Sequence, residues 1–360
     1  MRHACILCLT LLSSSCESGS SRSARADQPV AVPTGEEVSC RSCSLSFQRL
    51  RSFPHGDDDT LFGPHAQLMV LASGKAVVAP VMPSGGIARF DTAGQLERVV
   101  GRSGGGPGEL GDVFSLAPSA DSLLVAARDR VSLFSSELTP IREAPVATIY
   151  WVVRALGSGA FIGSSVAADR SPTLHILGPD LTLRRSFGVL PPGAPRERRS
   201  LAVDARTQIW ASVPGRYALE HWDTTGALLK TLIRTARFFP TWTEREAFSR
   251  NPYSQPPLPR VIDLYSVGSD LWVLLEVADA HWTAQPAPAG EHNPMLSLAA
   301  AERRVDRLLE VLDTASGTAR VSARLPMFAI SFGAAGQLIS VREDSEGIRR
   351  FDEWAVTVTQ

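Results

Sequence analysis

The chain has 360 residues, of which 44% are hydrophobic and 20% are charged, and its formal net charge at pH 7 is -1. This composition is typical of a globular protein that is long enough to bury a large core. A net charge near zero gives no support for nucleic-acid binding, which depends on a basic surface, so we expect no nucleic-acid partner.

The first residues resemble a secretion signal. Arg2 and His3 precede a short apolar run, Ala4–Leu12, which is followed by small residues. This run is too short to cross a membrane as a helix. We therefore predict a signal peptide over residues 1–15 and export of the protein.

Cys16 follows Ser13-Ser14-Ser15, and small residues before a cysteine resemble the bacterial lipobox, in which the cysteine receives a lipid. The lipobox has leucine three positions before the cysteine, whereas this chain has Ser13 there and Leu12 one step earlier. The resemblance implies a lipoprotein of the bacterial cell envelope that meets the membrane through a lipid on Cys16 only. An ordinary secretion signal with an incidental cysteine is the alternative.

Residues 16–39 are predicted to form a flexible tether, because they are rich in Ser, Arg, Ala, Gly and Pro and show no apolar periodicity. If Cys16 carries a lipid, Cys40 and Cys43 remain as an even pair, which predicts one disulfide in an oxidising compartment. Residues three apart in a strand lie about 10 Å from each other, so this bond requires a turn at Arg41-Ser42. A redox Cys-x-x-Cys motif and a zinc site are the alternatives, and neither a βαβ context nor two further ligands is evident nearby.

A tight turn recurs along the rest of the chain. Phe90-Asp91-Thr92-Ala93-Gly94 returns as Trp222-Asp223-Thr224-Thr225-Gly226 and as Leu312-Asp313-Thr314-Ala315-Ser316-Gly317, each time between apolar alternating runs. With weaker copies the turn occurs at intervals of roughly 40–45 residues, and one interval is twice as long. The apolar residues that precede it are Phe90, Phe134, Leu177, Trp222, Leu312 and Phe351. A second set of Gly/Ser/Asp turns also has six members, and only the one at Gly268 falls inside the long interval, so the chain contains six units and one is enlarged.

Each unit is predicted to hold four strands, which are rich in Val, Ile, Leu, Phe and Trp and are bounded by Gly, Asp and Ser. Four-stranded units of this length predict an all-β fold, a six-bladed β-propeller over residues 40–360. Ser44–Phe53 has no partner strand before it and is predicted to close the last blade, which begins at Met327, as its fourth strand. The Phe351-Asp352 copy of the turn lacks the glycine, so its strand is expected to continue to Val358. An all-β sandwich is the alternative, although it would not need a matched pair of turns in every unit.

The segment Phe90–Gly94, followed by an apolar strand and Gly101–Leu110, resembles the repeat of six-bladed β-propellers related to NHL repeats. Those repeats often run aromatic-Asp-x-x-Gly, a strand, then Gly-x-x-Gly-x-Gly-Pro-Gly-Glu-aromatic, and Leu110 occupies the aromatic position here. The resemblance implies the fold. It does not imply a reaction, because the family includes scaffolds, binding proteins and some enzymes.

Antiparallel neighbours place the two kinds of connection on opposite faces of such a disc. The recurring turns share one face, and the long connections share the other, where functional loops are expected. The long connections are Pro54–His65, Arg102–Gly111, Leu190–Ser200 and the two insertions Arg234–Pro259 and Thr283–Arg303.

The two insertions carry the aromatic residues of a predicted binding lip. The candidate residues are Trp242, Phe248, Tyr253, His281, Trp282 and His292. The alternative is that these aromatic side chains pin long loops onto the disc. Thr241 and Glu244 have the spacing of a helix capping box and predict a short helix in the first insertion.

Other motifs predict no catalytic residue, metal or cofactor. Asp57-Asp58-Asp59 could bind Ca²⁺, but no further ligands can be named and a solvated loop is the preferred interpretation. The glycine-rich loop Gly101–Gly108 lacks the Gly-Lys-Ser/Thr ending of a phosphate cradle, so we interpret it as a turn. The histidines show no metal-ligand spacing. The charged runs Arg196-Glu197-Arg198-Arg199 and Arg303-Arg304 are interpreted as solvated surface.

These features favour an envelope-anchored, non-catalytic and monomeric propeller that binds a protein, peptide or glycan through its long-loop face. The alternative is a propeller hydrolase or lyase with a metal-assisted site at the central channel.

Overall fold

The computed structural model describes residues 30–54, 61–82, 85–102, 104, 106, 109–166, 171–251, 253–284, 298–343 and 349–360. The predicted signal peptide and the candidate residues Cys16, Asp57–Asp59 and His292 lie outside these ranges. None of the helices in the described part of the chain is long and apolar enough to cross a membrane.

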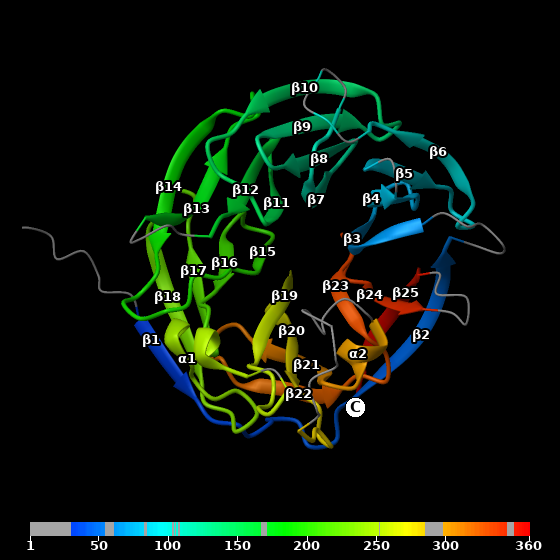
Figure 1. Ribbon diagram of the computed structural model, residues 1–360. Coiled ribbons are helices and arrows are strands. Elements are labelled where there is room, and N and C mark those ends of the chain that lie inside the picture. The colour runs from blue at the N-terminus through cyan, green and yellow to red at the C-terminus, as the bar shows by residue number, and fades with distance from the viewer. Residues whose placement is uncertain are drawn as a thin grey trace, which may run out of the picture.

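The strands form six sheets arranged in a ring, each with four antiparallel strands, as predicted (Figure 1). Blade 1 contains β3 (Leu61–Val70), β4 (Ala76–Met82), β5 (Gly86–Phe90) and β6 (Leu96–Val100). Blade 2 contains β7 (Val113–Ser119), β8 (Ser122–Ala127), β9 (Arg130–Ser135) and β10 (Pro140–Pro145). Blade 3 contains β11 (Val152–Gly157), β12 (Ala160–Ser164), β13 (Pro172–Leu177) and β14 (Leu183–Val189).

The second half of the ring includes the enlarged unit. Blade 4 contains β15 (Leu201–Val203), β16 (Ile209–Ser212), β17 (Ala218–Trp222) and β18 (Leu228–Arg234). Blade 5 contains β19 (Arg260–Val267), β20 (Asp270–Ala278), β21 (Val305–Asp313) and β22 (Ala319–Arg324). Blade 6 contains β23 (Ala329–Phe332), β24 (Leu338–Glu343), β25 (Arg349–Thr359) and, as its outer strand, β2 (Ser44–Phe53).

The predicted closure of the ring is confirmed. Strand β2 pairs antiparallel with β25 from Ser44 opposite Thr359 to Phe53 opposite Phe351. Strand β25 runs past Phe351-Asp352 without a turn, as the missing glycine predicts. The two ends of the chain therefore share one sheet, which removes an unpaired edge from the last blade.

The recurring turn is built by an aspartate and a glycine. Asp91 Oδ1 accepts hydrogen bonds from the backbone amides of Ala93 and Gln95, each at 2.8 Å. Asp223 accepts from two amides in the same way in blade 4. Gly94 has φ +87°, a left-handed conformation that glycine adopts without a steric penalty. The aspartate satisfies the turn's own amides, so the motif is structural.

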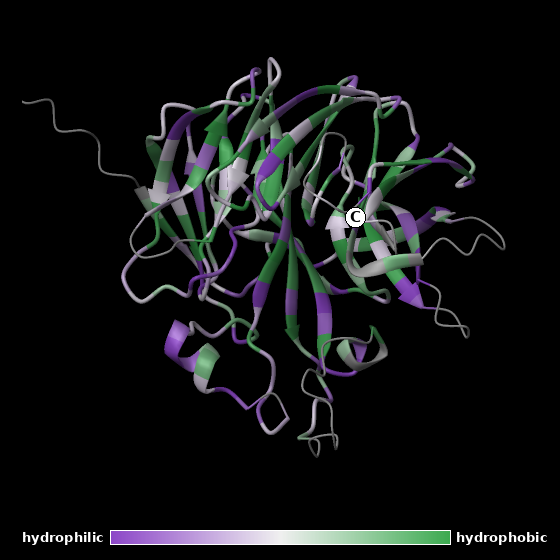
Figure 2. Cartoon of the chain, turned by 45° about the horizontal axis from the view of Figure 1, so that its top comes forward, coloured by the Kyte–Doolittle hydropathy of each residue, from purple (hydrophilic) through white to green (hydrophobic). Residues whose placement is uncertain are grey.

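Apolar clusters fill the boundaries between neighbouring blades. Val77 and Ile87 of blade 1 belong to one cluster with Leu123 of blade 2, and all three are fully buried. Trp210 of blade 4 and Leu271 of blade 5 belong to another. Burial of each such side chain contributes about 1.5–3 kcal/mol, so these clusters hold neighbouring blades together. Figure 2 shows that hydrophobic residues follow the strands of the disc.

One part of the predicted tether lies on the propeller. Strand β1 (Val30–Thr34) pairs in parallel with β18, the outer strand of blade 4. Farther along, the backbone amide of Ser39 donates to the carbonyl of Ala319 in blade 5 at 2.7 Å. The prediction of a tether over residues 16–39 is therefore wrong for residues 30–39, whose backbone groups find partners on the outer strands. A disulfide then joins Cys40 to Cys43, with 5.3 Å between their Cα atoms.

Candidate functional site

Both insertions and the connections between blades lie on one face of the disc, which we call the long-loop face. The first insertion joins β18 to β19 and contains the short helix α1 (Glu244–Ser249). The second joins β20 to β21 and contains α2 (Leu298–Glu302). Both helices lie on the same side of the strands (Figure 2). The opposite face carries the tight turns, and we call it the turn face.

Helix α1 begins two residues later than the sequence predicts. Its N-cap is Thr243, whose hydroxyl accepts from the backbone amide of Glu246, and the Glu246 carboxylate accepts from the Thr243 amide at 2.6 Å. The prediction of Thr241 and Glu244 as the capping pair is wrong. Both pairs have the same spacing, but only the second completes the reciprocal bonds of a capping box.

Trp242 has a packing role. Its side chain is 3% exposed, and its indole Nε1 donates to the carbonyl of Pro259 at 2.9 Å. Its backbone amide donates to the carbonyl of Gly215 in blade 4 at 2.7 Å. Trp242 thus holds the start of the first insertion against its end and against the disc. This packing role is the alternative to a binding lip that the sequence allows for these aromatic residues.

The other aromatic candidates are placed separately. Phe248 is 82% exposed on α1, and none of the residues of this helix is buried. Tyr253 is half-buried in the same insertion, while His281 is exposed and Trp282 is half-buried in the turn after β20. Within the described ranges no ring contact joins any two of these side chains, whereas Phe114 and Trp151 are in ring contact elsewhere on the face.

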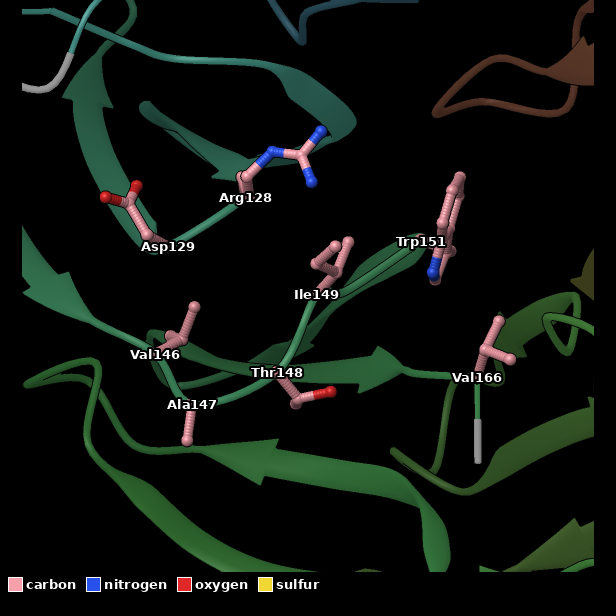
Figure 3. A pocket seen from close by; sticks show the side chains of 8 residues that line it. All are labelled: Arg128, Asp129, Val146, Ala147, Thr148, Ile149, Trp151 and Val166. Atoms are coloured by element: carbon pink, nitrogen blue, oxygen red, sulfur yellow. The ribbon is translucent and has the colours of Figure 1, made fainter. Parts of the chain in front are cut away.

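One pocket on this face lies between blades 2 and 3 (Figure 3), whereas the two insertions belong to blades 4 and 5. Its volume is about 450 Å³, within the range usual for ligand sites. It is formed by the turn between β8 and β9, the connection from β10 to β11 and the end of β12. The lining residues are Arg128, Asp129, Val146, Ala147, Thr148, Ile149, Trp151 and Val166.

The pocket combines an aromatic wall with a cation. The Trp151 and Phe114 rings meet edge to face at 4.7 Å between centroids. The Arg128 guanidinium lies 5.7 Å from the Phe114 centroid and forms an exposed ion pair with Asp112 at 2.6 Å. Figure 3 shows the side chain of Ile149 between those of Arg128 and Trp151. Such a surface suits an apolar or aromatic group that also carries polar atoms.

A row of charges crosses blade 5 near the long-loop face. Arg260 of β19, Glu276 of β20 and Arg307 of β21 are direct register partners on neighbouring strands. Arg307 forms an ion pair with Glu276, and its Nε donates to the carbonyl of Ala329 at 2.7 Å. Burial raises the pKa of Glu276, but the charges of Arg307, Arg260 and Arg198 outweigh burial and lower it overall.

The connection from β14 to β15 brings Glu197 and Arg198 to this row. Glu197 Oε1 lies 3.1 Å from Nη2 of Arg260. Burial raises the pKa of Glu197 although Arg260 and Arg198 oppose this effect. Burial also lowers the pKa of Arg198, while its surface remains exposed to solvent. These residues form a cluster of charged groups around Glu197 and Arg198 on the long-loop face.

The interpretation of the run Arg196–Arg199 as solvated surface is wrong for Arg199. This side chain is 0% exposed, forms an ion pair with Glu220 of β17 and donates from Nε to the carbonyl of Ser212 at 2.7 Å. Arg198, the residue before it, has no hydrogen-bond or ion-pair partner within the described part of the chain. Arg199 points toward β16 and β17, where its partners lie, whereas Arg198 is exposed.

Deeper along the inner strands, an ion pair links blades that are not neighbours. Arg154 of β11 pairs with Asp263 of β19, so blades 3 and 5 meet across the short strand β15. The other oxygen of Asp263 accepts from the backbone amide of Phe332 in blade 6 at 2.9 Å. Asp263 therefore ties three blades together near the centre of the ring.

The glycine-rich loop is filled by its own glutamate. Glu109 Oε2 accepts from the Gly106 amide at 2.7 Å, and Oε1 accepts from Arg102 Nε at 2.8 Å. A Cβ atom on Gly104 would lie 2.0 Å from Glu109 Oε2. The carboxylate occupies the concave side of the loop, which agrees with turn chemistry rather than a phosphate cradle.

The buried histidines belong to the blades. His175 lies between the hydroxyls of Ser165 and Ser186, 2.9 Å from each, and burial lowers its pKa to about 4. The His221 ring stacks on Trp210 with 4.1 Å between centroids. In the described ranges no three His, Cys, Asp or Glu residues are grouped as metal ligands would be.

Comparison with solved structures supports the fold through a match to an exported protein. A Bacteroides fragilis protein described as exported superposes with a TM-score of 0.57 at 9% identity, over 91% of this chain and 100% of that one. BamB from Moraxella catarrhalis gives a TM-score of 0.46 at 9% identity, over 86% of this chain and 100% of BamB. Streptogramin B lyase gives 0.46 at 11% identity, over 88% of this chain and 98% of the lyase. No protein-family model and no curated protein matches the chain.

Proposed function

We propose that this protein is a non-catalytic propeller of the bacterial cell envelope, lipidated at Cys16, that binds a protein, peptide or glycan through its long-loop face. The pocket between blades 2 and 3 carries this proposal. It combines a volume of about 450 Å³ with an aromatic wall, apolar side chains and an arginine, on the face where the connections are longest. On the turn face, the connections are short turns in which an aspartate side chain accepts hydrogen bonds from backbone amides of the same turn.

Site-specific photo-cross-linking in the native envelope tests the binding face. Ala147 lines the pocket and is exposed, and Ala93 is an equally exposed alanine in a turn on the opposite face. A photo-reactive residue at Ala147 should give discrete adducts that the additional Trp151→Ala substitution reduces, and the same residue at Ala93 should give none. Equal labelling from both positions would contradict the proposal.

Intact mass of the membrane-extracted protein tests the anchor. The mature chain should begin at Cys16 and carry two or three acyl chains. A chain that begins elsewhere, or an unmodified Cys16, would refute the lipoprotein interpretation while leaving the binding face untouched.

One observation favours the alternative of a hydrolase or lyase. Glu197 is a half-buried carboxyl whose pKa burial raises, and it lies beside Arg260 and Arg198. A carboxyl with a raised pKa suits a general acid. Hydrolysis or elimination of model esters, peptides or glycosides that Glu197→Gln abolishes at unchanged stability would replace the binding proposal. Activity that is equal in the variant would be a contaminant.

A further inference from the structure

Three ion pairs lie around Arg198, which has no hydrogen-bond or ion-pair partner of its own among the residues that the structure describes. They are Glu197 with Arg260, Glu276 with Arg307, and Asp263 with Arg154. The side chain of Arg198 interacts electrostatically with Asp263, Glu276 and Glu197, but none of them bonds to it. Each nearby carboxylate already has an arginine, so the group as a whole carries one surplus positive charge, on Arg198.

Arg198, which carries the surplus positive charge, lies at the start of an inner strand on the long-loop face. Arg198 precedes β15, and Trp151 of the pocket immediately precedes the neighbouring inner strand β11. Strands β11 and β15 contact each other. Both residues therefore border the centre of this face. The aromatic wall of the pocket and the guanidinium of Arg198 thus lie on the same part of the molecule.

A guanidinium without a partner has donors that an anion would satisfy. Arginine presents up to five N–H groups in a planar fork that matches a carboxylate with two parallel hydrogen bonds. Arg198 is exposed and can be reached by a ligand, while desolvation by the neighbouring chain lowers the pKa of its guanidinium. Hydrogen bonds to charged groups are stronger in such surroundings than in bulk water.

The charges of the site favour one kind of anion. A monoanionic carboxylate would neutralise the single surplus charge. A phosphate dianion would bring a second negative charge among Glu197, Glu276 and Asp263, whose arginine partners are already engaged in ion pairs.

We propose that Arg198 binds a carboxylate of a peptide ligand, either its C-terminal carboxylate or the side chain of an acidic residue. The inference rests on the proposed function, since it names the chemistry by which the long-loop face recognises its ligand. Arg198 is a specificity-determining residue in this account, and the pocket with Trp151 receives an apolar part of the same peptide.

Fluorescence polarisation with the full-length protein tests this proposal. The probes are fluorescently labelled hexapeptide mixtures with a free C-terminal carboxylate or a C-terminal amide, each with Glu or Gln fixed at one internal position. Arg198→Gln should weaken binding of the carboxylate-bearing mixtures about 10-fold or more, and Arg198→Lys should retain part of it. The matched control is Arg206→Gln, because Arg206 is an exposed arginine in a turn on the turn face.

The two comparisons, free carboxylate against C-terminal amide and Glu against Gln, identify the source of the carboxylate. Preference for the free C-terminus assigns the terminal group, and preference for Glu over Gln assigns the side chain. Equal binding of carboxylate-free and carboxylate-bearing mixtures, unaffected by Arg198→Gln, would overturn the inference while leaving the proposed function intact. Binding of none of the mixtures, together with no adduct from Ala147, would overturn both.

Discussion

The boundary between blades 4 and 5 and the centre of the long-loop face use arginine in opposite ways. At the boundary, Arg234 is 5% exposed, donates to both oxygens of Glu310 at 2.7 and 2.8 Å, and also donates to the carbonyl of Gly35. At the centre of the face, Arg198 is exposed and unpaired within the described part of the chain. An arginine that donates to several groups of its own chain holds the fold together, whereas an exposed arginine that lacks such partners is available to a ligand.

The largest expected effect comes from breaking the buried pair. Arg234→Met leaves Glu310, which is 0% exposed, without its cation in the interior. The free energy of unfolding should fall by about 3–5 kcal/mol, because an uncompensated buried charge is strongly destabilising. Urea unfolding measures this change.

A matched variant on the surface sharpens that prediction. Arg128 and Asp112 form a pair that is largely exposed, so Arg128→Gln should lower the free energy of unfolding by about 0–1 kcal/mol. Equal losses of unfolding free energy in Arg234→Met and Arg128→Gln would show that burial does not distinguish the two kinds of arginine.

The aromatic residues of the first insertion allow the same comparison. Trp242→Ala removes a buried ring and its hydrogen bond to Pro259, and should cost about 3 kcal/mol or more in urea unfolding. Phe248→Ala removes a ring that is 82% exposed and should change stability by less than about 0.5 kcal/mol. A large loss in Phe248→Ala would mean that α1 packs against the disc in solution.

Sequence reasoning succeeded where local chemistry sets the structure. The Asp-x-x-Gly turn can be recognised from sequence because Asp91 bonds amides within four residues of itself. The missing glycine after Asp352 equally predicts the uninterrupted strand β25 and the closure by β2. These signals lie within a few residues, so they need no knowledge of distant partners.

Features that depend on distant partners could not be predicted. The run Arg196–Arg199 has the pattern of a solvated surface, and only Glu220, on another strand, shows that Arg199 is buried. Strand β1 pairs in parallel with an edge that its own sequence does not indicate. The pocket arises where short connections of two blades meet, and Trp151 carries no motif that would mark it.

The pH dependence of the free energy of unfolding tests a third case, an ionisable side chain that is buried without a counter-charge. The pKa of His175 is lowered to about 4 in the folded chain from an ordinary value of 6.5, so the unfolded chain binds a proton first as pH falls. The stabilisation is complete above pH 6.5 and is lost progressively between pH 6.5 and 4. At pH 4.5 this group should lower the free energy of unfolding by about 2–3 kcal/mol relative to pH 7.

The control for this pH effect is His175→Gln, which lacks the titrating group. Its stability should fall by about 2–3 kcal/mol less than that of the unsubstituted protein over the same interval. An identical pH dependence in both proteins would show that His175 is not held neutral in the fold.

Arg198→Gln should have the smallest effect on stability, less than about 0.5 kcal/mol, because the side chain forms no bond that folding depends on. Urea unfolding of this variant checks the assignment. A loss of several kcal/mol would place Arg198 with Arg199 and Arg234 among the residues that hold the blades together.

Hydrogen–deuterium exchange tests the central claim, that ligand binding belongs to the long-loop face, most directly. The full-length protein would be compared with and without the tightest-binding hexapeptide of the polarisation experiment. We predict slower exchange in residues 146–151 and 195–200, with residues 91–95 and 223–227 of the turn face unchanged. Protection confined to the turns, or spread evenly over both faces, would contradict the account.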